Sequence, residues 1–130
     1  MTSSVLGQIA AKLGRVVALA CPGPLLTLTA DGAVPIDQDR TVVLSKGSAG
    51  AFTVAAPGAT NFAAGREITL LTGTDFAHVT TFTGTTLQDG TAGANSTWTA
   101  TAVQGCALTF VAVTAAKWNV KSFNLGTIAP

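Results

Sequence analysis

The sequence predicts an all-β domain, a sandwich or barrel of about eight short antiparallel strands, preceded by an N-terminal helix or extended arm. Three observations lead to this prediction. Beyond residue 24, apolar positions alternate with polar ones, which is the two-residue period of a half-buried strand. The alternating segments recur every 8–15 residues or so, a spacing roughly typical of sandwiches and barrels. Glycine-rich turns separate them, and no long helical pattern intervenes as it would in βαβ units.

Residues 1–24 differ in character from the rest of the chain. Their apolar side chains are spaced by three and four residues, which is the stripe of an amphipathic helix; they are Val5, Leu6, Ile9, Leu13, Val16 and Val17. Two glycines weaken such a helix, so we expect either a short helix or an extended arm. Pro22 ends the segment, because proline lacks the backbone N–H that a helix uses. We expect a single β domain over residues 25–130.

Eight segments of this β domain show the alternation, and we expect a strand in each: 25–29, 41–45, 52–54, 67–72, 76–83, 97–102, 108–112 and 118–120. In the longest segment, one face is expected to carry Phe76, His78, Thr80 and Phe82. Trp98 and Trp118 alternate with polar neighbours. We therefore expect both tryptophans in the core rather than on a sugar-binding surface.

The chain carries very few charges. Charged residues make up 10% of it, against roughly 25% in ordinary soluble domains. A monomer of this size exposes about 6,300 Å², so its charges would average roughly one per 490 Å². Such a surface tends to associate, and we expect neighbouring protein subunits to cover much of it. The alternative is a threonine-rich monomer that stays soluble through its hydroxyl groups.

The composition also argues against other partners. No apolar run reaches the roughly 18 residues of a membrane span, so no membrane partner is expected. The seven Lys and Arg residues are scattered rather than clustered, which argues against nucleic acid. The two cysteines, Cys21 and Cys106, lack the spacing of a zinc site. We expect two free, buried thiols, and one disulfide between them is the alternative.

No group of residues suggests catalysis. His78 is the only histidine, and Asp75, three positions earlier, would face the opposite side of a strand. Asp37 and Asp39 flank a single residue in a loop, but a calcium site needs six to eight oxygens. We therefore expect that the protein is not an enzyme and has no catalytic residue, cofactor, metal or small-molecule substrate.

Two parts of the sequence resemble motifs of tailed-bacteriophage virion proteins. The segments Thr41–Ser45, Ala51–Pro57 and Gly65–Leu71 are similar to successive strands in those proteins. Gly105–Val113, followed by Lys117–Val120, is similar to their closing hairpin, where a W-x-V pattern is typical. The resemblance covers residues 25–123 and implies a virion β domain.

Within that group, the resemblance implies a capsid decoration (cement) protein, commonly a homotrimer. Such a protein is made in the cytoplasm of the host bacterium, binds the major capsid protein on the outer shell of the virion, and stabilises the shell. The alternative is the head domain of a tail fibre or spike that binds host surfaces or glycans. The distinct N-terminal segment and the scarcity of aromatic residues favour decoration. We hypothesise that the interface with the shell or a neighbouring subunit includes Val5, Leu6, Ile9 and Leu13.

Overall fold

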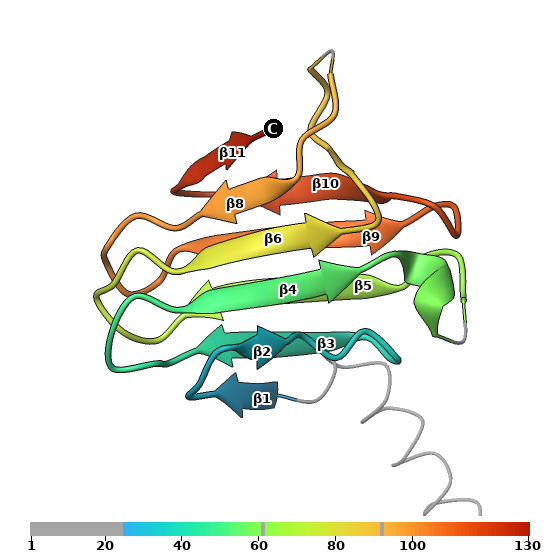
Figure 1. The fold of residues 1–130 in the computed structure, drawn as a ribbon. Coiled ribbons are helices and arrows are strands. Elements are labelled where there is room, and N and C mark those ends of the chain that lie inside the picture. The colour runs from blue at the N-terminus through green and yellow to red at the C-terminus, as the bar shows by residue number, and fades with distance from the viewer. Residues whose placement is uncertain (1–24, 61, 92) are drawn as a thin grey trace, which may run out of the picture.

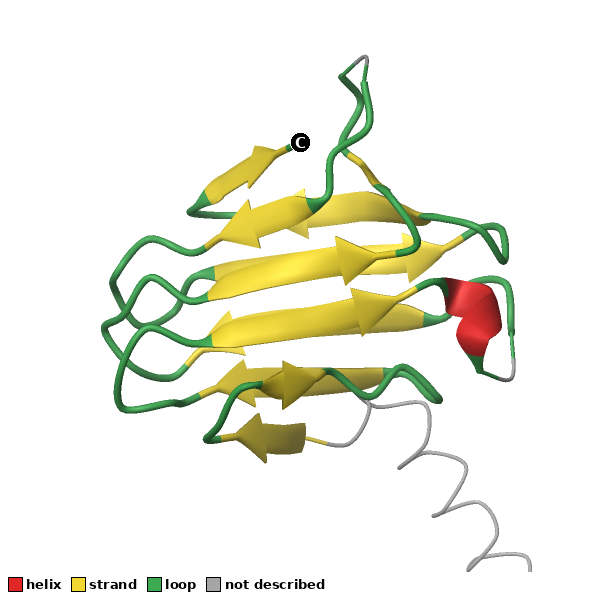
Figure 2. Cartoon of the chain, viewed as in Figure 1, coloured by secondary structure: helices red, strands yellow, loops and turns green. Residues whose placement is uncertain are grey.

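The computed structural model describes residues 25–60, 62–91 and 93–130, which form a sandwich of two β-sheets (Figures 1 and 2). The larger sheet contains, in spatial order, β1 (Leu25–Leu28), β3 (Arg40–Leu44), β5 (Glu67–Thr72), β9 (Ala107–Ala112), β10 (Trp118–Phe123) and β7 (Leu87–Gln88). The smaller sheet contains β11 (Thr127–Ala129), β8 (Thr97–Thr99), β6 (Val79–Thr83), β4 (Ala51–Ala55) and β2 (Gly32–Ala33). A single 3-10 turn, η1 (Pro57–Ala59), follows β4. The expected all-β sandwich is confirmed.

The first six strands alternate between the two sheets. In Figure 1 the chain passes from β1 to β6 by rising from the lower edge of the sandwich. β1, β3 and β5 lie in the larger sheet, and β2, β4 and β6 lie in the smaller one. Neighbours are parallel within each sheet, so that Leu26 is opposite Val42 and Val42 is opposite Leu70. This half of the sandwich is therefore a coil of three turns, and each turn gives one strand to each sheet.

The expected antiparallel arrangement is wrong for much of the sandwich. The parallel pairs are β1–β3, β3–β5, β2–β4, β4–β6 and β7–β10. The antiparallel pairs are β5–β9, β9–β10, β6–β8 and β8–β11. Alternation of apolar residues identifies the faces of a strand but not its partner. Parallel neighbours need a crossover connection, and here each crossover within the coil contains a strand of the opposite sheet.

Several expected boundaries also differ from the structure. The described chain forms eleven strands rather than eight, because β2, β7 and β11 are short strands outside the expected segments. The expected strand 76–83 begins only at Val79, since a tight turn, in which the His78 N–H donates to the Phe76 carbonyl, precedes it. Residues 1–24, where a helix or an arm is expected, lie outside the described residues.

The core between the sheets is built on aromatic side chains. Trp98, Trp118, Phe52 and Phe110 are fully buried, which confirms the core position expected of both tryptophans. The Phe110 and Trp118 rings meet edge to face, with centroids 5.0 Å apart. Such a pair stabilises by about 0.5–1.5 kcal/mol beyond its burial. The indole Nε1–H of Trp118 donates to the Ala55 carbonyl at 2.8 Å, which joins β10 to β4 across the sandwich.

Candidate functional site

The outer side of the smaller sheet is the most unusual surface of the described chain. In β4 and β6 the buried positions are Phe52, Val54, Thr80 and Phe82, so the residues between them face outward. The same alternation and the pairing registers extend this surface over all five strands. We call it the small-residue face; it consists of Ala33, Ala51, Thr53, Ala55, Val79, Thr81, Thr83, Thr97, Thr99, Thr127 and Ala129.

The small-residue face is ordered in rows that run across the strands. Thr81 of the central strand β6 is opposite Thr53 on one side and Thr97 on the other. Ala33 and Ala129 complete this row at the two edges of the sheet. β-Branched threonine suits such a position because its side chain packs well on a pleated surface. The result is an array of hydroxyl and methyl groups without a charge.

Charged side chains lie elsewhere. Among the described strands they occur only in the larger sheet, at Arg40, Glu67 and Lys121. Lys121 Nζ lies 3.0 Å from Glu67 Oε2, and this ion pair spans the intervening strand β9. The remaining charges of the described chain are in loops. The low charge content of the sequence thus leaves the strands of the smaller sheet without any charged side chain.

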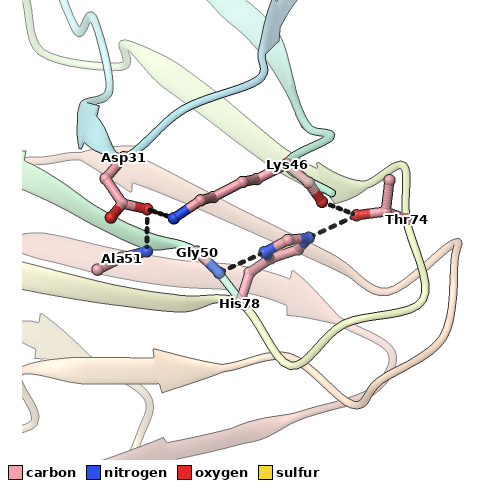
Figure 3. A network of polar contacts seen from close by, with 6 residues as sticks. All are labelled: Asp31, Lys46, Gly50, Ala51, Thr74 and His78. Carbon is pink, nitrogen blue, oxygen red and sulfur yellow. Dashed lines mark hydrogen bonds and ion pairs between the residues drawn. The ribbon is translucent and has the colours of Figure 1, made fainter. Parts of the chain in front are cut away.

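A network of polar contacts joins three consecutive turns of the coil at one end of the sandwich (Figure 3). We call it the loop clasp; its residues are Asp31, Lys46, Gly50, Ala51, Thr74 and His78. Asp31 Oδ1 accepts a hydrogen bond from the Lys46 ammonium at 2.8 Å and another from the Ala51 N–H at 2.9 Å. These two donors lower the pKa of Asp31, the Lys46 contact having the larger effect. The turn before β2 is thereby attached to the loop between β3 and β4.

His78 attaches the next turn of the coil to that loop. The Gly50 N–H donates to His78 Nδ1 at 3.0 Å. Thr74 Oγ1 donates to the Lys46 carbonyl at 2.7 Å, so it accepts from His78 Nε2–H at 2.8 Å. The neutral imidazole of His78 therefore uses both ring nitrogens in hydrogen bonds, Nδ1 as an acceptor and Nε2 as a donor. Burial is the main cause of a lowered pKa of His78, Lys46 lowers it further, and Asp31 opposes the shift.

The loop clasp makes His78 a residue that positions loops. A general base needs a ring nitrogen that can reach a substrate proton. In the described structure, Nδ1 is already occupied by Gly50 and Nε2 by Thr74. Asp75, which sequence reasoning considered as a carboxylate partner for His78, instead accepts a hydrogen bond from the Gln104 N–H at 2.9 Å. His78 thus bonds Gly50 and Thr74, whereas Asp75 bonds a different loop through Gln104.

Asp37 and Asp39 line an open depression of about 330 Å³. Asp37 forms an ion pair with Arg40 at 2.6 Å, and Asp39 accepts a hydrogen bond from the Glu67 N–H at 2.9 Å. The two carboxylates are therefore engaged with different partners. Within the described residues, no three His, Cys, Asp or Glu side chains gather as a metal site would require.

Cys106 is fully buried, as expected of this thiol, and its Sγ donates to the Thr101 carbonyl at 3.3 Å. Cys21 lies outside the described residues, so the expectation of two free thiols, with one disulfide as the alternative, stays a prediction. The expected interface residues also lie outside the described residues, so their role stays a prediction; they are Val5, Leu6, Ile9 and Leu13.

Sequence reasoning missed the small-residue face, although part of its signal was visible. The threonines at positions 81, 83, 97 and 99 indicate outward positions, but nothing in the sequence shows that their strands are neighbours. Among the described residues there is no helix long and apolar enough to cross a membrane. Neither a protein-family model nor a curated protein sequence matches this chain.

Proposed function

We propose that this chain is a structural virion protein of a tailed bacteriophage, a capsid decoration protein that binds the outer shell and stabilises it. The observation that carries the proposal is the small-residue face, a whole sheet surface without a charged side chain. A soluble monomer gains little from such a surface, whereas a protein covered by other subunits can bury it without desolvating ions. The resemblance of residues 25–123 to virion β domains supports the same reading.

The proposed mechanism consists of binding alone. A copy that bridges neighbouring subunits of the major capsid protein adds an interface, which must break before those subunits can separate. Because the shell repeats the same site many times, modest interfaces sum to a large resistance against internal pressure. The N-terminal residues Val5, Leu6, Ile9 and Leu13 are proposed to supply apolar contacts to the shell or to a neighbouring copy.

The proposal is tested on tailed phage particles purified from cells that encode this chain. Antibodies raised against the recombinant protein are expected to label the particle heads. Mass spectrometry is expected to find the chain in a copy number of the same order as the major capsid protein. Label confined to the tail, with few copies per particle, would favour the alternative of a fibre or spike head. Absence of the chain from purified particles would refute both assignments.

A further inference from the structure

The small-residue face lacks every feature that makes a surface selective for a charged partner. We propose that this face is the surface through which copies of the chain pack against one another. This inference rests on the proposed function, because a decoration protein that forms an oligomer needs a surface for contact between its copies. The inference identifies that surface. The larger sheet, with its Glu67–Lys121 ion pair, remains available for a different contact.

Symmetric association is the case that this chemistry suits best. Around a symmetry axis, a residue approaches its own copies, so any charge near the axis meets a like charge. Thr81, in the central strand and the central row, avoids that repulsion. A threonine hydroxyl both donates and accepts a hydrogen bond, so it can pair with a second threonine in either direction. Thr53 on one side repeats the same chemistry. Thr97 on the other side donates its hydroxyl hydrogen to the Ala129 carbonyl at 3.1 Å, so it can only accept.

Alanine and threonine also permit close approach of two sheets. The edge positions Ala33 and Ala129 and the outward positions Ala51 and Ala55 carry only a methyl group. None of the side chains on the face is long, so few rotamers are lost when the face is covered. The entropy cost of ordering an interface rises with flexible side chains such as lysine and glutamate, and these are absent here.

The size of the face indicates how strong the association is. The five strands are two to five residues long. With neighbours about 4.8 Å apart and a rise of about 3.3 Å per residue, they cover roughly 290 Å² in projection. A standard stable interface buries about 800 Å² on each partner. The face is therefore the centre of an interface, and residues around it must complete the contact if the assembly is to be stable.

Exposed apolar side chains lie in the loops that continue from this sheet. Phe76 precedes β6, Val103 follows β8 and Leu125 precedes β11; their side chains are 38%, 40% and 47% exposed. These loops contact one another, since Gln104 N–H donates to Asp75 and the Asn124 amide donates to the Gly105 carbonyl. Asp75 is the one charged residue in these three loops, and its carboxylate accepts the Gln104 N–H. The three exposed apolar side chains lie beyond the strands where these loops meet, and we include them in the proposed interface.

The experiment compares Thr81→Glu with a matched control, Thr41→Glu. Thr41 is also an outward strand threonine, but it lies on the larger sheet. Molar mass is measured by light scattering over a wide range of protein concentration, and circular dichroism verifies the fold. Wild type and Thr41→Glu are expected to exceed 13.0 kDa. Thr81→Glu is expected to weaken association by at least about 100-fold, because like charges are brought together in the interface.

An unchanged mass for folded Thr81→Glu would overturn the proposal, as would a wild-type monomer at every concentration. If Thr81→Glu does not fold, Thr53→Glu replaces it, because Thr53 is exposed on the neighbouring strand β4. The same two outcomes then test the proposal. The result is independent of the particle experiment. Detection on phage heads together with an unchanged mass for Thr81→Glu would leave the decoration function intact and remove only this interface.

Discussion

Replacement of Trp118 by alanine is expected to lower the free energy of unfolding by about 3–5 kcal/mol, the largest effect of any single substitution considered. Trp118 is fully buried and packs against the Phe110 ring. It also supplies the Nε1–H that bonds the Ala55 carbonyl in the opposite sheet. Its removal leaves a cavity between the sheets and an unpaired carbonyl. Chemical denaturation followed by circular dichroism, at one fixed protein concentration, measures the change.

Two further variants separate packing from hydrogen bonding at this position. Trp118→Phe retains an aromatic ring but loses the donor, and a smaller loss of about 1–3 kcal/mol is expected. Phe123→Ala serves as the control, since Phe123 is 49% exposed at the end of the same strand. A Trp118→Ala protein as stable as Phe123→Ala would show that the core is not organised as described.

Gly50→Ala is expected to destabilise the protein by about 1–3 kcal/mol, the cost typical of forcing an extra group into a packed site. A Cβ atom at Gly50 would lie 2.5 Å from Cε2 of Phe52 and 2.9 Å from Nδ1 of His78. Both neighbours are buried, so neither can move freely. The displaced backbone would also weaken the Gly50 N–H hydrogen bond to His78. Thermal and chemical unfolding measure the loss.

The same loop provides the control for this substitution. A methyl group added at Gly47 would have no other atom within 4 Å, and Gly47 does not adopt a left-handed backbone. Gly47→Ala is therefore expected to be neutral or to raise the free energy of unfolding by up to about 1 kcal/mol, because alanine lowers the conformational entropy of the unfolded chain. Equal effects of Gly47→Ala and Gly50→Ala would contradict the loop clasp as a tight contact between consecutive turns of the coil.

The sequence was sufficient to predict which residues face the core. Alternation at 41–45, 52–54 and 108–112 assigned Val42, Phe52 and Phe110 to the interior, and all three are buried. This succeeds because one face of each strand must be apolar when two sheets pack together. Phe76 and Ala102 are exceptions. The chain turns before Val79 and leaves the Phe76 ring partly exposed. The expected strand 97–102 ends at Thr99, and Ala102 is exposed.

Strand partners could not be predicted in the same way. Val42 pairs with Leu26 and Leu70, which are separated from it by 16 and 28 residues, and local alternation contains no information about such distant neighbours. Short strands are equally difficult to find: Leu87 is fully buried in a two-residue strand within a stretch rich in glycine. The small-residue face depends on these pairings, so it becomes visible only once the sheet order is known.

The central claim is that other protein subunits cover the uncharged surface of this chain. The molar mass of the unmodified protein in solution, measured from low to high concentration, tests it most directly. We predict a species of about three times 13.0 kDa, the mass of the homotrimer implied by the resemblance to decoration proteins. A single 13.0 kDa species that remains soluble at high concentration would contradict the claim.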